Sequence, residues 1–295
     1  YKLTNLAIHL LNGVLLFVLL RRLLAAPSVT VRDERFLAGV AALAATLWLV
    51  HPINLTSVLY VVQRMNSLAT LFSLAALICY VHGRYALIDG RARGWVQIAL
   101  LAPLLTLLGI LSKENAVLTL PFAAGIEICF FRFQTAHARD RLILIIGYIV
   151  LLIVPLAAFL IYALIDPEFL TKRFARRPFT MGERLLTESR VVWFYLGLAI
   201  IPRLREFGIY HDDFVQSVSL FEPLSTVFAI EGIVIVAGIA VFNWRRRPIL
   251  AFGIAWFLVG HSLESTLVSL ELVYEHRNYM PVMGVLFALS YDLAI

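Results

Sequence analysis

Residues 95–131 read WVQIALLAPLLTLLGILSKENAVLTLPFAAGIEICFF, an apolar stretch interrupted by the triplet Lys113-Glu114-Asn115. As one helix it would be about 55 Å long, whereas the hydrocarbon core of a bilayer is roughly 30 Å thick. The stretch therefore predicts two spans joined at the triplet. Ionisable residues at such a depth are costly and indicate a functional site. The alternative is a tight interfacial turn in which Lys113 and Glu114 pair with each other and with water.

The composition of the whole chain is that of a membrane protein. Of its 295 residues, 61% are hydrophobic and 15% are charged, and the mean hydropathy is +0.87. These values lie far outside those of soluble domains, and the apolar runs are too long for an outer-membrane barrel. We predict an all-α, polytopic helical bundle in the lipid bilayer. The net charge of +6 does not indicate a nucleic-acid partner, because arginines between spans are topology signals first.

The apolar runs predict about nine spans in three regions. The N-terminal membrane helices occupy 1–164, an outer-face loop domain occupies 165–223, and the C-terminal membrane helices occupy 224–295. The predicted spans are 3–20, 36–50, 56–81, 95–111, 115–131, 142–164, 224–242, 249–263 and 280–295.

The short basic connections predict the orientation. Four of them, 21–35, 84–93, 132–141 and 243–247, hold 13 of the 25 basic residues, as expected for cytoplasmic loops. The turn at Lys113 and the connections 165–223 and 264–279 then lie on the outer face. That face is the periplasmic side of a bacterial inner membrane, or the lumen of the endoplasmic reticulum in a eukaryote.

The segment VVWFYLGLAIIP, residues 191–202, is the exception to this alternation. A full span there would move Arg245–Arg247 to the outside. We therefore expect an interfacial or re-entrant helix with both ends on the outer face.

Polar clusters gather on the predicted outer face. In HPINLTSVLYVVQRMN, residues 51–66, His51 precedes a proline and so ends a helix, and Gln63 and Arg64 follow near the outer part of the next helix. Arg64 is equally consistent with snorkelling toward lipid headgroups. Lys113 has the chemistry to bind a lipid-linked phosphate as a point charge.

The segment HSLESTLVSLELVYEHRNYMP, residues 261–281, carries the densest cluster. Glu264, Glu271 and Glu275 are spaced i, i+7, i+11, which predicts one shared helix face. An arginine beyond them could clamp a phosphate or pair with one of the glutamates, and a purely structural ion-pair network is the alternative. The residues that follow at the mouth of the last span are His276, Arg277, Asn278 and Tyr279.

A third cluster is His211-Asp212-Asp213, whose adjacent carboxylates could bind a divalent cation or act as a base; solvated loop residues are the alternative. His261 and Glu264 have the spacing of a metal pair but no evident third ligand, so we predict no metal site. The chain has no Gly-rich phosphate loop, nucleophile elbow or Walker motif, so a soluble nucleotide-sugar or ATP site is unsupported.

Three motifs, taken in order, carry a family resemblance. HPINLTSVLYVVQRMNSLATLFSLAALICY, LLGILSKENAVLTLP and LELVYEHRNYMPVMG resemble the membrane region of the transmembrane and tetratricopeptide-repeat O-mannosyltransferase family and its bacterial relatives. RLLTESRVVWFYLGLAIIP followed by HDDFVQSVSLFEP resembles that family's middle loop domain. The resemblance implies a GT-C fold and tetratricopeptide repeats after the last span.

The resemblance also implies a function. Such enzymes transfer a sugar, mannose or another hexose, from a polyprenyl-phosphate donor to a protein or glycan acceptor on the outer face, by inverting displacement and without a cofactor or an obligatory metal. The implied donor-phosphate residues are Arg64, Lys113, Glu114 and Arg277. The residues expected to support them are His51, Gln63, Asn115, His211, Glu271, His276, Asn278 and Tyr279.

The position of the catalytic acid follows from the same resemblance. The family's acidic motif lies in the first outer loop, and YKLTNLAIHLLNGVLLFVLL at the start of this chain looks like the second helix, so we expect that acid upstream of Tyr1. Candidates within the chain are Asp212, Asp213 and Glu275. Two other functions stay open: a transporter or flippase for lipid-linked substrates, which would favour charges near the bilayer midplane and an internal repeat, and a non-catalytic membrane scaffold.

Overall fold

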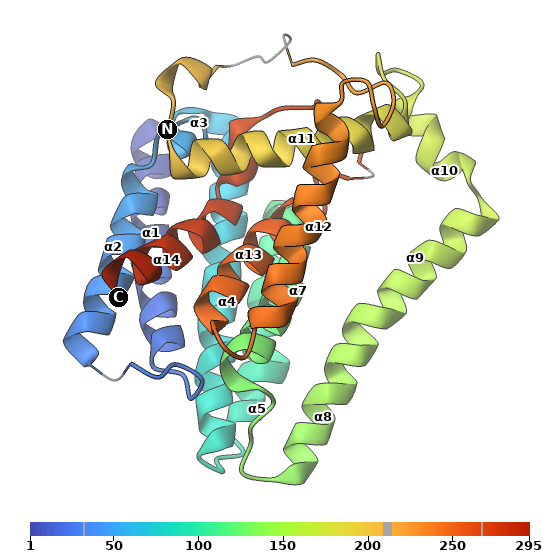
Figure 1. Ribbon diagram of the computed structural model, residues 1–295. Coiled ribbons are helices and arrows are strands. Elements are labelled where there is room, and N and C mark those ends of the chain that lie inside the picture. The colour runs from blue at the N-terminus through green and yellow to red at the C-terminus, as the bar shows by residue number, and fades with distance from the viewer. Residues whose placement is uncertain (32, 209–213, 267) are drawn as a thin grey trace.

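The computed structural model describes residues 1–31, 33–208, 214–266 and 268–295, and this part of the chain is helical, without strands (Figure 1). Six helical segments in it are long and apolar enough to cross a membrane, which makes the chain an integral membrane protein. They are Lys2–Leu24 (α1), Val61–Ile88 (mainly α4, Arg64–Ile88), Gly94–Ser112 (α5 Gly94–Val96 and α6 Ala102–Ser112), Glu114–Phe131 (with α7, Thr119–Ile126), Ala138–Ile165 (α8 Ala138–Tyr148 and α9 Val154–Ile165) and Ser225–Asn243 (α12).

Three further apolar helices are too short to span alone. They are α2 (Glu34–Val50), α13 (Pro248–His261) and α14 (Pro281–Ala294), of 17, 14 and 14 residues, against about 20 for a span. α2 continues after a 52° bend into Pro52–Leu59, which ends with α3 (Leu55–Leu59), and this pair counts as a seventh span only if both parts are taken together. Each of the nine predicted segments thus overlaps at least one helix, but only six helical segments of the described chain are long enough to be a span on their own, so nine spans are not confirmed.

The break at the triplet is confirmed. α6 ends at Ser112, Lys113 is extended with φ −158° and ψ 140°, and a new helical turn, Glu114–Leu118, begins directly after it. The segment predicted as one helix over 56–81 differs, because the chain is also extended at Tyr60 (φ −87°, ψ 128°) and the long helix runs on to Ile88. The polar residues of 51–66 therefore lie in a bent entry to α4.

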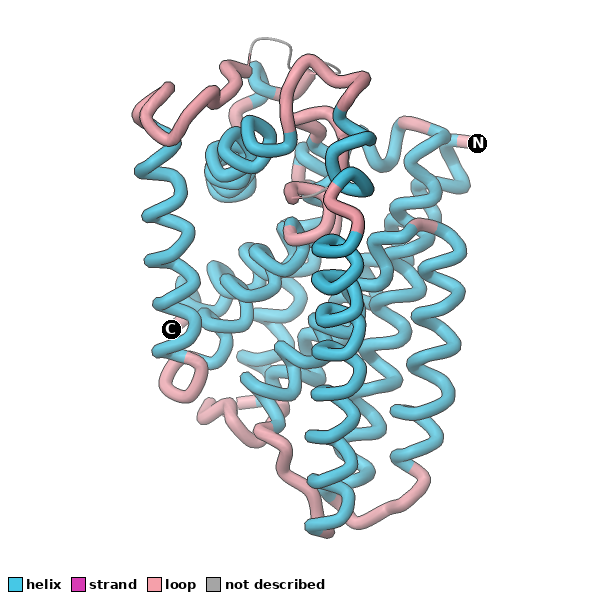
Figure 2. The backbone as a smooth tube through the Cα atoms, turned by 90° about the vertical axis from the view of Figure 1, so that its right-hand side faces the viewer, coloured by secondary structure: helices cyan, strands magenta, loops and turns pink. Residues whose placement is uncertain are grey.

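The long helices run side by side, and loops join them at both ends (Figures 1 and 2). The continuous helix of α8 and α9 stands at the side of the bundle, and its large apolar side chains are mostly exposed, as suits a lipid-facing helix. Its upper end leads through α10 (Glu168–Thr171) to α11. The connections after α1, α4 and α12 lie at the opposite end (Figure 1).

α11 (Met181–Ile200) lies across the ends of the other helices rather than along them (Figure 1). It begins ten residues before the predicted 191–202 segment, because Thr180 and Glu183 form a capping box at its start. Its crosswise direction fits the interfacial placement expected from the sequence. The helix carries Arg184 and Glu188 on its buried side.

α13 and α14 cross closely because glycines line their contact. A Cβ atom on Gly253 would lie 2.6 Å from the carbonyl oxygen of Gly284, and one on Gly260 would lie 2.6 Å from Pro281 Cγ. Such distances are closer than real contacts, so only glycine permits this approach. The crossing holds both ends of the connection 262–280 in place.

Glu127, which lies inside a span, has a structural role. Its carboxylate accepts bonds from Arg84 Nε (2.6 Å), the Tyr80 hydroxyl (2.5 Å) and the backbone nitrogen of Phe133 (2.7 Å). Arg84 and Glu127 are fully buried. A buried ion pair with this many hydrogen bonds ties the end of α4 to the end of the span Glu114–Phe131.

Candidate functional site

A cavity of about 400 Å³ opens at the α11 end of the bundle, between the entry to α4, the Lys113 turn and the connection 262–280. It collects residues from segments that are far apart in the sequence. The residues predicted for the site that line it are Gln63, Lys113, Glu114, Glu271, Glu275, His276 and Arg277. The convergence of these residues makes the cavity the candidate site.

Lys113 extends into the protein and pairs with Glu264. Its Nζ lies 2.7 Å from Glu264 Oε1 and 3.4 Å from Asn66 Oδ1, and both charged side chains are almost fully buried. Burial disfavours the charged form of Glu264, but the charge and hydrogen bond of Lys113 outweigh it and lower the pKa of that carboxyl. Pairing of Lys113 with Glu114 is therefore wrong; Glu114 is exposed at the cavity rim.

The glutamates do not share a helix face, which corrects the prediction from their spacing. In the described part of 262–274 the chain is not helical. Ser262 and Thr266 bond to the carbonyl oxygens of Val259 and Ser262, which offers the backbone an alternative to the helix. Two buried arginines, Arg184 and Arg277, take up further carbonyl oxygens of this connection.

Arg184 reaches this connection from α11. Its Nη1 donates to the carbonyl oxygens of Leu270 (2.7 Å) and Glu271 (3.0 Å), and its Nη2 donates to that of Glu264 (2.5 Å). The same Nη2 lies 2.8 Å from Glu188 Oε1. Arg184 therefore fixes the backbone conformation of the connection that carries Glu264.

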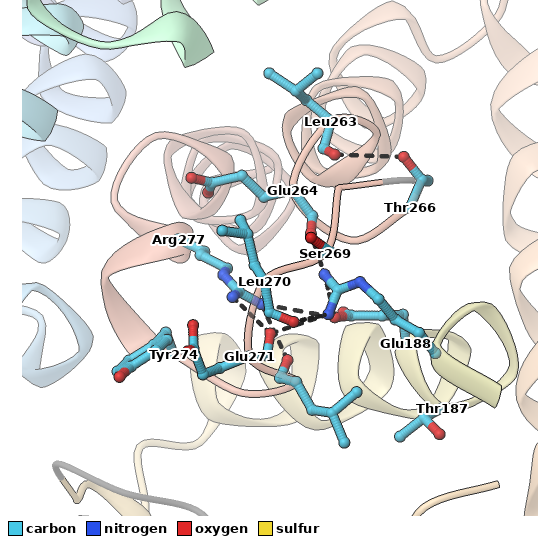
Figure 3. A network of polar contacts seen from close by, with 12 residues as sticks. Thr187, Glu188, Leu263, Glu264, Thr266, Ser269, Leu270, Glu271, Tyr274 and Arg277 are labelled. Atoms are coloured by element: carbon cyan, nitrogen blue, oxygen red, sulfur yellow. Dashed lines mark hydrogen bonds and ion pairs between the residues drawn. The ribbon is translucent and has the colours of Figure 1, made fainter. Parts of the chain in front are cut away.

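Arg277 completes the network from the other side (Figure 3). It donates to the carbonyl oxygens of Leu272 (3.0 Å) and Glu271 (2.6 Å), and its Nη1 lies 3.6 Å from Glu188 Oε1. One carboxylate thus faces two guanidinium groups. Burial raises the pKa of Glu188 to about 7, against the opposing pull of Arg184 and Arg277.

Two other carboxylates lie in the cavity wall. Glu271 pairs with Arg177, with Nη1 and Oε1 2.7 Å apart. Glu275 is 2% exposed and accepts a hydrogen bond of 3.1 Å from the backbone nitrogen of Gly208. Burial lowers the pKa of the neighbouring His276 to about 4, helped by the charge of Lys113, so this ring is neutral near pH 7.

Some predicted residues lie beside the cavity rather than in its wall. Arg64 Nε donates to Asn5 Oδ1 (2.8 Å), and its guanidinium carbon lies over the Tyr1 ring, 5.7 Å from the ring centroid. His51 Nε2 contacts the carbonyl oxygen of Ala199 (3.2 Å) and so ties the end of α2 to α11. Asn115 lines a smaller adjoining pocket that also contains Arg277.

Asn278 and Tyr279 are buried below the site and serve the packing. Asn278 Nδ2 donates to the carbonyl oxygen of Glu275 (3.3 Å). The Tyr279 hydroxyl lies 2.8 Å from His9 Nδ1, and Trp48 Nε1 donates to the Tyr279 carbonyl oxygen (2.8 Å). The remaining candidates, His211, Asp212 and Asp213, fall outside the described residues.

The residues that hold the cavity-lining residues in place were not identified from the sequence; they are Arg184, Glu188 and Asn66. Arg184 and Glu188 form a buried i,i+4 pair ahead of an apolar run, a signal that was available in RLLTESRVVWFYLG. Asn66 bridges two segments, since its Oδ1 accepts from Lys113 and its Nδ2 donates to the carbonyl oxygen of His276 (2.9 Å). Nothing in the local sequence distinguishes Asn66 from an ordinary helix residue.

No group of three His, Cys, Asp or Glu side chains with the geometry to hold a metal ion occurs among the described residues. His261, suspected as one member of a metal pair, instead stacks on the Tyr195 ring with an interplanar angle of 18°.

Comparison with known proteins gives one distant similarity. Over 260 residues the chain is 23% identical to a Caenorhabditis elegans protein named as a protein O-mannosyl-transferase. The match covers 87% of this chain and 32% of that protein, so the chain spans about a third of the relative's length. No protein-family profile and no solved structure matches the chain. The similarity supports a family of O-mannosyltransferase type at the coarsest level.

Proposed function

We propose that this chain is the membrane part of a glycosyltransferase that uses a polyprenyl-phosphate sugar and transfers its hexose to a protein or glycan acceptor. The observation that carries the proposal is the cavity in which Lys113 and Arg277, both buried, converge at the ends of apolar helices. The distant O-mannosyl-transferase relative supports the same reaction class. The GT-C fold and associated tetratricopeptide repeats belong to this proposal.

The cavity wall suits a substrate with an apolar tail. Val62 and Met65 line it and are 66% and 39% exposed, respectively, beside the charged residues. An isoprenoid chain would lie against this apolar side, while its phosphate reaches Lys113 and Arg277. Such a site lies at the boundary of membrane and water, where a lipid-linked donor and a water-soluble acceptor meet. We place this boundary on the periplasmic or luminal side, following the positive-inside rule.

The phosphate must compete for Lys113, because Glu264 already pairs with it at 2.7 Å. Arg277 is more available to the phosphate than Lys113. Its nearest carboxylate, Glu188, is shared with Arg184, so the positive charge of Arg277 is only partly neutralised. Cationic groups aimed at the phosphate stabilise the negative charge that develops as it leaves. In this scheme Arg277 binds the phosphate first, and Lys113 binds it once the ion pair between Lys113 and Glu264 has opened.

The transfer itself is a displacement at the anomeric carbon. The acceptor hydroxyl oxygen forms a bond to that carbon as the carbon–oxygen bond to the phosphate breaks, and the electron pair leaves with the phosphate oxygen. A carboxylate takes the hydroxyl proton. Glu275 is a carboxylate of the described chain in the cavity wall; the acid expected in an upstream loop is the other candidate for this role.

Sugar transfer by the full-length protein tests the proposal. We expect Arg277→Ala and Lys113→Ala to lower transfer from a polyprenyl-phosphate mannose by at least about 100-fold, as loss of a charge-stabilising donor does in other enzymes. The matched control is Lys172→Ala, an exposed lysine that pairs with Glu168 on the surface. Unchanged transfer by the folded Arg277 and Lys113 variants would remove the phosphate role from these residues. Transport of the lipid-linked sugar without transfer would favour a flippase.

A further inference from the structure

A second cavity, of about 410 Å³, lies at the opposite end of the bundle from the candidate site. α4 joins the two ends: Gln63 and Arg64 at its start lie near the first cavity, and its last turns line the second. With 25 residues, α4 is about 37 Å long. The side chains that line the second cavity include Arg22, His82, Tyr85, Arg91, Arg93 and Gln97.

The charge of this cavity is of one sign. Three arginines line it, and no Asp or Glu of the described chain does. Arg91 is paired with Asp89 outside the cavity wall. Arg22 and Arg93 make no ion pair with any residue that the structure describes, so two positive charges remain for an anion. This differs from the first cavity, where carboxylates line the wall beside the cations.

Two buried polar atoms in the same wall lack partners. Neither His82 Nε2 nor Gln97 Oε1 has a hydrogen-bond partner among the described residues, although both are shielded from solvent. A buried polar atom without a partner costs free energy, which a ligand group that bonds to it would recover. A group of arginines that only sets the orientation of a membrane protein requires positive charge, but it does not require unpaired polar atoms such as His82 Nε2 and Gln97 Oε1 beside it. The wall therefore combines positive charge with unpaired polar atoms, as a binding site for a polar anion requires.

The surroundings favour a lipid over a soluble ion. Val96 and Leu100, which lie before and after Gln97 in the same helical segment, are 53% and 59% exposed and belong to a span with few buried residues. Acyl chains would lie along this apolar face. The cavity itself lies at the level where the helices end, which is the level of lipid headgroups.

We propose that this cavity binds the phosphate headgroup of an anionic membrane lipid. Arg22 and Arg93 hold the phosphate, and a headgroup hydroxyl supplies the donor that Gln97 Oε1 lacks. Basic pockets between membrane helices on the cytoplasmic side are suited to such headgroups. The site is separate from the proposed sugar-transfer site and does not depend on it.

Binding of short-chain lipids to the detergent-solubilised full-length protein tests this site. The probes are dioctanoyl-phosphatidylglycerol, dioctanoyl-phosphatidylcholine and inorganic phosphate. We expect saturable binding of the first, with weaker binding of the other two. The double variant Arg22→Ala/Arg93→Ala should weaken binding of the phosphatidylglycerol roughly 30-fold, from the contribution of two basic residues.

Two further variants separate a site from diffuse attraction. Arg245→Ala/Arg246→Ala removes two positive charges at the same end but outside the cavity, and should leave the affinity within about 3-fold. Gln97→Leu keeps the charge and removes the inner polar atom, and should also weaken binding. Equal losses of phosphatidylglycerol affinity in the two double variants would overturn the proposal. So would unchanged affinity in both Gln97→Leu and Arg22→Ala/Arg93→Ala. Binding of inorganic phosphate as tight as that of the lipid would also overturn it.

Discussion

Lys113 is costly to bury in an apolar stretch, and its partner lies 151 positions away in the sequence, at Glu264. The pair has a second layer: the backbone of Glu264 is held by Arg184, and Asn66 contacts Lys113 Nζ. Removing one member of a buried pair leaves an uncompensated charge, which costs more than removing both. Stability and function can therefore be separated at this pair.

We predict that Lys113→Met lowers the free energy of unfolding by about 3–5 kcal/mol, and that Lys113→Met/Glu264→Gln recovers most of this loss without recovering sugar transfer. Thermal unfolding in detergent and the transfer assay measure the two effects. Lys172→Met is the control, because its pair with Glu168 is exposed and worth less than about 1 kcal/mol. A double variant as unstable as the single one would show that Glu264 is not the partner that matters.

Glu188 predicts a dependence of stability on pH. Its pKa of about 7 lies above the ordinary value of 4.5, so between these pH values the folded protein holds a proton that the unfolded chain releases. The stabilisation is complete below about pH 4.5 and is lost as the pH rises through 7, with a limit of about 3 kcal/mol.

The thermal midpoint should therefore fall between pH 5 and pH 8 by more in the parent than in Glu188→Gln, which stays neutral. The two proteins should be similarly stable near pH 5, and the Gln variant should be the more stable near pH 8. Parallel curves over this range would contradict the raised pKa.

At the scale of elements, the crossing of α13 and α14 positions the connection that carries Glu264, Glu275 and Arg277. We predict that Gly253→Ala costs about 1–3 kcal/mol and reduces transfer, because its Cβ would meet the Gly284 carbonyl oxygen at 2.6 Å. Gly238→Ala in α12 is the matched control, since nothing lies within 4 Å of a Cβ there. Equal effects of the two substitutions would show that helix contact does not position the site.

The helices could be predicted from the sequence because apolar runs in a membrane need backbone hydrogen bonds within the segment. The break at Lys113 was equally visible. The course of 262–274 was not, since it depends on arginines from α11 and from position 277 that take up its carbonyl oxygens. A spacing rule for helices does not apply where long-range donors replace the helical bonds.

Part of the lining of the candidate cavity was predictable from the sequence, but the pairing of its charged residues was not. Lys113, Glu271, Glu275 and Arg277 stood out as charges near apolar runs, and all four line the cavity. The partners did not stand out, because Lys113 pairs across the fold and the pair of Arg184 and Glu188 reads locally as a solvated i,i+4 pair. Pairing of charges over long distances is decided by tertiary packing.

At the scale of the whole molecule, the two cavities should face opposite sides of the membrane. We predict that Lys172→Cys and Arg246→Cys, in a background with Cys79→Ala and Cys129→Ala, react with a membrane-impermeant thiol reagent from opposite sides of sealed vesicles. Arg246→Cys should react from the cytoplasmic side, where short basic loops lie. Reaction of both from one side would contradict the proposed topology.

The central claim is that a polyprenyl-phosphate sugar binds in the cavity lined by Lys113 and Arg277. The most direct measurement is photocrosslinking of the full-length protein with a photoreactive polyprenyl-phosphate mannose, followed by peptide mapping. We predict crosslinks in the peptides that contain the wall segments Val62–Met65 or Tyr274–Arg277, and their loss in Arg277→Ala. Crosslinks confined to the arginine-lined cavity at the other end, or unchanged by Arg277→Ala, would contradict the account.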